Sequence, residues 1–255
     1  MRTKVEPGRA GFTEGLASEW AKFRTVRSTR WTLAAMAAFV LGIAVFVGAT
    51  RSLQPDDTVL GGSLTGATFG LLVGASFGVL AISREFATGT IGATLMACPR
   101  RGAVLATKAT VTAAVMFGVA LATSFLAYQV GTVMLPDGYA PGTPMPALLG
   151  VAACFSVTAL AGLAVGTLLR HSAGAITTMV TVLLLPSLIG PLLGGWERWV
   201  AGASPVAAMQ KLSQSSDAAP DAVGSLGAWP SLLLVCGYVL VALVGAGLVF
   251  RRRDA

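Results

Sequence analysis

Few residues of this 255-residue chain carry side chains that could do catalytic or metal chemistry. The single histidine, His171, follows Arg170, and the three cysteines, Cys98, Cys154 and Cys236, are far apart. They match no metal-ligand spacing and supply no convincing nucleophile and base. The chain contains no Gly-Lys pair and therefore no G-x-x-x-x-G-K-[ST] phosphate loop. The sequence predicts no catalytic residue, metal site or cofactor in this chain, and ATP could act only through a separate subunit.

The composition of the chain indicates that it consists largely of membrane-spanning helices. Hydrophobic residues make up 55% of the chain and charged residues 11%, against about 45–50% and about 25% in ordinary globular proteins. Six runs lack Asp, Glu, Lys and Arg, and each exceeds or equals the roughly 20 residues that a helix needs to cross a bilayer. The runs cover residues 31–50, 58–83, 109–136, 138–169, 172–196 and 222–250. We expect an all-α polytopic membrane protein with spans at about 32–49, 61–82, 109–131, 147–169, 174–193 and 231–250.

Basic residues predict the orientation, because Lys and Arg near span ends stay on the cytoplasmic side. With both termini cytoplasmic, fifteen of the 18 Lys and Arg residues lie inside, and only Arg51, Arg198 and Lys211 lie outside. The net charge of +7 is then explained by a basic cytoplasmic surface that faces anionic lipid. Nucleic-acid binding would need clustered basic and aromatic residues, which the sequence lacks. Arg outnumbers Lys fourteen to four beside many Ala, Gly and Val residues, which is typical of a GC-rich bacterial genome. We therefore expect the chain to lie in a bacterial cell membrane.

The expected organisation is a cytoplasmic lead-in over residues 1–31, a membrane domain over 32–250 and a basic tail over 251–255. No charged residue lies in the middle of a predicted span, which weakens a proton- or ion-coupled carrier. His171 lies at the inner end of the fourth span, where an interfacial anchor is favoured over a proton relay.

The inner connection between spans two and three has the most specific pattern. Phe86, Ile91 and Leu95 could form an apolar face on a short helix over 84–96, which Pro99 would end. Such a helix could lie in the lipid interface, fit a groove on a cytoplasmic partner or only join two spans.

This region resembles the pattern of ABC type-2 permeases, which has an acidic-aromatic pair, Gly-Thr-Ile, a Leu, a Pro-Arg and a later Lys. The matching residues are Glu85-Phe-Ala-Thr-Gly-Thr-Ile, Leu95, Pro99-Arg100-Arg101 and Lys108. The stretch from Ser18 to Trp31 looks like the amphipathic lead-in of short actinobacterial members, and the six-span plan agrees.

The resemblance implies a membrane subunit of an ATP-driven exporter. In that family two permease copies pair, as a homodimer or with a paralogue, and each docks on an ABC ATPase subunit. A helix over about 16–28 would lie along the inner leaflet, with Leu16, Trp20 and Phe23 on one face and Arg27 and Arg30 pointing much the same way. The coupling residues that the resemblance implies are Arg84, Glu85, Phe86, Thr90, Ile91, Leu95, Arg100 and Arg101.

Span two contains a stripe of glycines every four residues, which lets helices approach closely. Packing within the subunit is favoured over a subunit interface. The stripe consists of Gly62, Gly66, Gly70, Gly74 and Gly78. In the family, spans two and five bound the translocation route, so the resemblance makes Phe69, Phe77, Val180 and Leu184 candidates for the substrate path.

After span five, residues 194–212 are semi-apolar but too short to cross the bilayer. A re-entrant or surface-lying outer lid, as in these permeases, competes with a solvated loop. A path without fixed charge suits amphiphilic or apolar cargo, such as a drug-like natural product, a peptide or a lipid. The alternatives are a self-contained carrier or channel and a non-transporting membrane scaffold.

Overall fold

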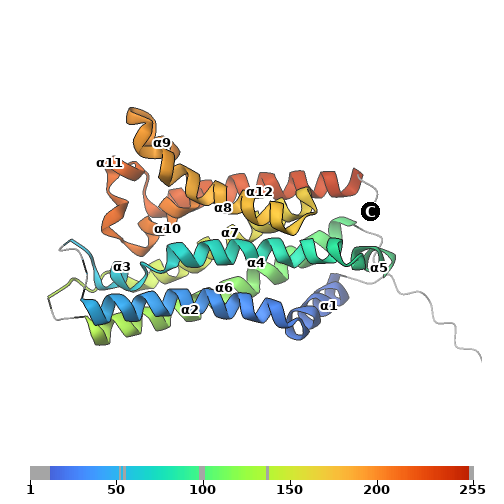
Figure 1. Ribbon diagram of the computed structural model, residues 1–255, viewed down its shortest axis with the longest axis horizontal. Coiled ribbons are helices and arrows are strands. Elements are labelled where there is room, and N and C mark those ends of the chain that lie inside the picture. The colour runs from blue at the N-terminus through green and yellow to red at the C-terminus, as the bar shows by residue number, and fades with distance from the viewer. Residues whose placement is uncertain (1–11, 52, 54–55, 98–100, 136–137, 253–255) are drawn as a thin grey trace, which may run out of the picture.

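The computed structural model describes residues 12–51, 53, 56–97, 101–135 and 138–252, without the side chains of residues 93, 95, 97 and 191. These residues form a bundle of long helices that run roughly along one axis (Figure 1). Six described helices are long and apolar enough to cross a membrane. They are α2 (Arg27–Thr50), α4 (Ala67–Ala87), α6 (Arg101–Met134), α7 (Pro144–Leu169), α8 (Ser172–Ile189) and α12 (Ala228–Arg252). The all-α prediction with six spans is confirmed, whereas the cytoplasmic location of the termini stays a prediction.

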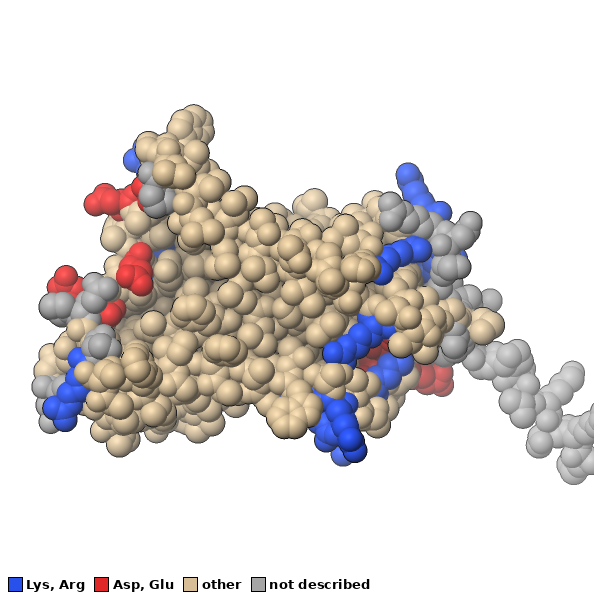
Figure 2. Space-filling view, in the orientation of Figure 1, with Lys and Arg blue, Asp and Glu red and all other residues tan. Residues whose placement is uncertain are grey.

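Charged side chains gather at the two ends of the bundle. The middle of the face in Figure 2 lacks Lys, Arg, Asp and Glu, as a surface that meets hydrocarbon requires. Most Lys and Arg on this face lie where Figure 1 places α1 (Phe12–Thr25), α5 (Thr90–Ala97) and the end of α12. We call this the basic end. The opposite end carries most of the Asp and Glu on this face, together with α3 (Val59–Ser63), α9 (Glu197–Val200), α10 (Pro205–Ser213) and α11 (Pro220–Val223).

The lead-in segment forms a helix that differs in its bounds from the prediction. Helix α1 spans Phe12–Thr25 rather than about 16–28, because Val26 is extended, with φ −81° and ψ 109°. Helix α2 then begins at Arg27. The predicted boundary between lead-in and membrane domain, at residues 31 and 32, therefore falls inside a helix.

The second predicted span is two helices. Helix α3 (Val59–Ser63) begins with the Thr58 hydroxyl, which accepts a hydrogen bond from the Gly61 amide at 3.0 Å. Helix α4 begins only at Ala67. A Cβ on Gly66, between the two helices, would lie 3.0 Å from the Phe39 carbonyl oxygen of α2. The expected single helix is therefore wrong at its N-terminal end.

The short helix between the second and third spans begins later than expected. Helix α4 continues through Arg84 to Ala87, and α5 covers Thr90–Ala97 rather than 84–96. Gly89 lies between them with φ +69°. This left-handed conformation suits glycine and ends helices after their last turn. The amphipathic pattern in the sequence continues on both sides of Gly89. The predicted start of the short helix, at residue 84, is therefore six residues too early.

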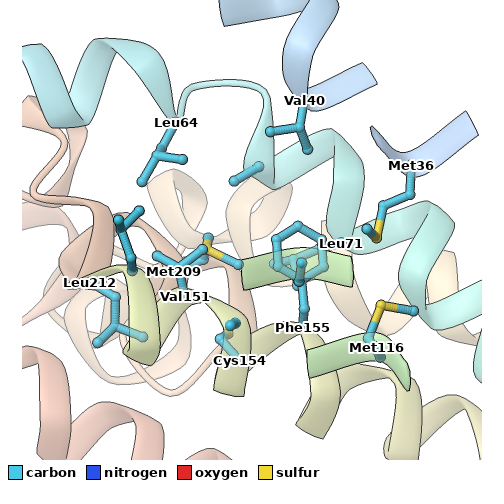
Figure 3. Packing of buried hydrophobic residues seen from close by; sticks show 14 of the residues in the cluster. Met36, Val40, Leu64, Leu71, Met116, Val151, Cys154, Phe155, Met209 and Leu212 are labelled. Carbon is cyan, nitrogen blue, oxygen red and sulfur yellow. The ribbon is translucent and has the colours of Figure 1, made fainter. Parts of the chain in front are cut away.

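The core centres on α7 and the helices around it. Phe155 of α7 is buried among Leu71 of α4, Met116 of α6 and Met209 of α10 (Figure 3). The glycine stripe lies at such contacts inside the chain: a Cβ on Gly78 would lie 1.8 Å from the Ala159 carbonyl oxygen of α7. Gly62 is on α3, so the five glycines do not share one helix.

The predicted lid over residues 194–212 divides into two parts. Trp196 and Trp199 are exposed, whereas helix α10 (Pro205–Ser213) packs between α7 and α12 with Met209 and Leu212 buried. The remaining short helices are η1 (Gly190–Leu192), η2 (Gly194–Trp196), α9 (Glu197–Val200), η3 (Ser216–Ala218) and α11 (Pro220–Val223). The second half of the segment thus packs within the bundle, and its role as an outer lid stays a prediction.

Candidate functional site

Four charged residues join three helices at the basic end. Lys108 of α6 contacts Glu19 of α1 at 2.6 Å and Glu85 of α4 at 2.9 Å. Lys22 of α1 contacts the same two carboxylates, Glu19 at 2.8 Å and Glu85 at 2.9 Å. We call Glu19, Lys22, Glu85 and Lys108 the charge cluster. Each ammonium group thus bridges both carboxylates, and the cluster ties the lead-in helix to two spans.

The charge cluster lies largely out of water. The Lys108 side chain is only 3% exposed, although it occupies the eighth position of the 34-residue helix α6. Two positive and two negative groups cancel, which offsets the cost of burying them. Burial on its own would lower the pKa of Lys22, but its hydrogen bonds to Glu19 and Glu85 outweigh burial and leave the pKa above its ordinary value. Lys22 therefore stays positive at neutral pH.

A second joint connects the end of α4 to the end of α12. The Phe86 ring meets the Phe250 ring edge-on at 6.2 Å between centroids, and the Arg170 guanidinium lies 5.0 Å from the Phe86 ring. Arg101 donates a hydrogen bond to the Phe250 carbonyl oxygen at 3.2 Å. Ile91 of α5 packs in the same buried group. The short helix is thereby connected to the last span.

A cavity of about 420 Å³ lies beside the charge cluster, between α1, α2, α4 and α6. Its apolar wall includes Phe23, Phe77, Leu80, Val111 and Val115. Its polar side includes the four residues of the charge cluster together with Arg84 and several threonines. The cavity is therefore amphipathic and suited in size to a small ligand or part of a larger one.

The structure separates the predicted coupling residues into three places. Arg84, Glu85 and Phe86 lie in the last turns of α4, and Glu85 belongs to the charge cluster. Thr90 is exposed on α5, whereas Ile91 is buried against the bundle. Arg101 begins α6, and Arg100 and the Leu95 side chain lie outside the described residues. Ile91 is buried and Phe86 half-buried within the chain, so this part of the predicted apolar face packs against the bundle, and its role in coupling stays a prediction.

The side of the lead-in helix that meets the bundle includes a charged residue that the apolar pattern did not predict. Leu16 and Phe23 are half-buried, but Trp20 is 49% exposed. The most buried residue of α1 is Glu19, which is 8% exposed. The pattern of apolar residues did not predict a role for Glu19, because its partner Lys108 is 89 residues away in the sequence. The sequence feature that pointed to this contact was Lys108, which belongs to the pattern that resembles ABC type-2 permeases.

Of the candidates for the substrate path, only Phe77 lines this cavity, where it also meets the Phe23 ring at 6.5 Å. Phe69 is 52% exposed on the outside of the single chain. Val180 and Leu184 are half-buried on α8 and do not line the cavity.

The other residues with possible chemistry have structural contacts. The His171 Nδ1 atom accepts a hydrogen bond from the Gly174 amide at 3.1 Å and so caps the start of α8. Cys154 is buried, with its sulfur 3.6 Å from the Pro205 carbonyl oxygen. Among the described residues, no three His, Cys, Asp or Glu side chains form a group that could hold a metal ion.

Comparisons with known proteins agree with this arrangement of spans. No curated protein matches the chain. The family described as "ABC-2 family transporter protein" matches residues 16–255, which include α5, the charge cluster and all six membrane-length helices. The match covers nearly the whole chain, and the chain is therefore a membrane protein of the ABC-2 transporter family.

Proposed function

We propose that this chain is the permease subunit of an ATP-driven exporter. The observation that carries the proposal is the family match over residues 16–255, in a chain whose sequence has no phosphate loop. Permeases of this family generally work with ATPase subunits, so ATP and Mg²⁺ would bind the partner. Two permease copies, identical or paralogous, would form the transport unit.

The coupling contact in this proposal is the exposed side of α5. Met96 is 82% exposed, Thr88 and Gly89 are exposed in the turn before the helix, and Thr90 is exposed at its start. Because the basic end has most of the Lys and Arg residues, it faces the cytoplasm, where the ATPase would lie. Movement of α5 would reach the end of α12 through the group that Ile91 forms with Phe86 and Phe250. Glu85, beside Phe86 in α4, would transmit the movement through the charge cluster to α1 and α6.

The cargo in this proposal is amphiphilic or apolar, such as a drug-like natural product, a peptide or a lipid. The support is the central part of the bundle, whose core consists of hydrophobic side chains (Figure 3). Export is favoured over import because the ATPase acts from the cytoplasm and the family resemblance is to exporters.

Met96→Arg tests the coupling contact without disturbing the half-buried Phe86 or the buried Ile91. A charge placed in an apolar docking surface should weaken co-purification of the ATPase subunit about tenfold or more and reduce ATP-dependent transport. Met145→Arg is the matched control, because Met145 is 63% exposed at the opposite end of the bundle. Equal behaviour of the two variants would show that α5 is not the docking helix.

Reconstitution separates the exporter from a self-contained carrier. We expect liposomes that contain the purified chain alone to be inactive, and liposomes that contain the chain with its ATPase subunit to transport only when ATP is present. Transport by the isolated chain without nucleotide would establish the carrier and overturn the exporter.

A further inference from the structure

The cavity between α1, α2, α4 and α6 has a charge imbalance that the charge cluster does not explain. The cluster is neutral, because Glu19 and Glu85 are each paired with Lys22 and Lys108. Arg84 also lines the cavity, and its guanidinium donates a hydrogen bond to the hydroxyl of Ser28. No acidic side chain forms an ion pair with Arg84 among the described residues. The polar side of the cavity therefore carries one surplus positive charge.

Arg84 is suited to bind an acidic group. A guanidinium presents a planar fork of donors that matches the oxygens of a phosphate or carboxylate. Lys22 lines the same cavity, and its side chain is 40% exposed. An acidic group at Arg84 would thus lie near a second cation that is accessible to solvent.

The remainder of the cavity suits hydrocarbon. Phe23, Phe77, Val111 and Val115 line it from α1, α4 and α6. The cavity lies at the basic end, where Arg27 and Arg30 of α2 are exposed. Exposed basic residues at the membrane surface attract anionic lipid and raise its concentration locally.

We propose that this cavity binds an anionic amphiphile, with its acidic head at Arg84 and Lys22 and its apolar part along Phe23, Phe77, Val111 and Val115. The ligand is either an acidic phospholipid of the inner leaflet or an acidic cargo molecule, since both share this chemistry. Binding requires only this chain, so the inference stands apart from docking of an ATPase.

Titration of the purified full chain with phosphatidylglycerol and with phosphatidylcholine of the same acyl chains tests the proposal, with native mass spectrometry counting bound lipid. We expect tighter binding of phosphatidylglycerol, and Arg84→Gln should weaken it about tenfold, the size of one lost hydrogen bond to a charged group. Arg251→Gln removes an exposed charge at the same end and is the control.

Two outcomes would overturn the site. One is equal affinity for the two lipids, and the other is an equal loss in Arg84→Gln and Arg251→Gln, which would mean general attraction to a basic surface. Val111→Phe is a second variant that leaves Arg84 in place and reduces the cavity. It should also weaken phosphatidylglycerol binding, and unchanged binding would place the lipid elsewhere.

The source of the ligand is decided in the complex with the ATPase subunit. A resident phospholipid should stay bound during ATP hydrolysis in lipid nanodiscs, whereas a cargo molecule should be released in step with ATP turnover. A spin-labelled acidic lipid held at the cavity reports both cases. A label that never occupies the cavity in wild-type protein would contradict the proposal.

Discussion

The two ends of the bundle are held together by different interactions. At the basic end, buried charges connect α1, α4 and α6 over long separations in sequence, as in the contact between Glu19 and Lys108. At the opposite end, the described residues show no ion pair. There Met209 and Leu212 of α10 are buried between spans, and the Gln214 side chain bonds to Thr143 at the start of α7.

This difference indicates how each end responds to change. A buried charge that loses its partner is costly, so the basic end depends on every member of the charge cluster. Apolar packing loses stability in proportion to the atoms removed and the cavity left behind. The basic end is therefore suited to a joint whose parts move as a unit, whereas the opposite end is a packed closure of the bundle.

The largest expected effect is that of Lys108→Met. Removing this ammonium leaves Glu19 and Glu85 with only Lys22 between them, and breaking such a buried pair costs about 3–5 kcal/mol. Thermal unfolding in detergent should show the loss, and hydrogen exchange should accelerate across α1. Adding Glu19→Gln should recover part of the stability.

Lys211→Met is the control for this prediction. Lys211 lies at the opposite end, where its ammonium group donates a hydrogen bond to the Ser231 hydroxyl at 3.3 Å. If both lysine variants unfold at the same temperature, the contrast between the two ends fails.

Met209→Ala should lower the free energy of unfolding by about 2–5 kcal/mol, as other truncations of buried side chains do. Met209 is 1% exposed and packs beside Phe155. The measurement is again thermal unfolding, with hydrogen exchange of α10 and α7 as the local readout. Met96→Ala is the exposed control and should have little effect. Faster exchange in α1 rather than α10 would contradict the division into two independent ends.

Gln214→Ala should have the smallest effect. The Gln214 side chain accepts a hydrogen bond from the Thr143 amide at 3.2 Å on an exposed surface, which is worth about 1 kcal/mol. Gln214 also has φ +58°, a conformation that glycine adopts freely. Gln214→Gly should therefore cost less than Gln214→Ala in thermal unfolding. Both variants lose the side-chain bond, so the reverse order would mean that the positive φ of residue 214 contributes little strain.

Some features of the site could be predicted from sequence and others could not. The pattern around Glu85 located the connection that contains α5, because its residue order is local. The same pattern turned Phe86 and Ile91 toward a partner, whereas both pack against the end of α12. Nothing in a helical pattern says that a helix more than 150 residues later will cover that face.

The six membrane-length helices and the gathering of basic residues at one end could be located along the chain before any contact was known. Crossing hydrocarbon depends on consecutive residues without charge, which are visible in the linear order of residues. The contacts of Lys108 with Glu19 and Glu85, and the position of Arg84 beside an amphipathic cavity, became visible only in the folded chain. An ion pair requires neighbouring helices, and close contacts such as that of Gly78 with Ala159 determine which helices become neighbours.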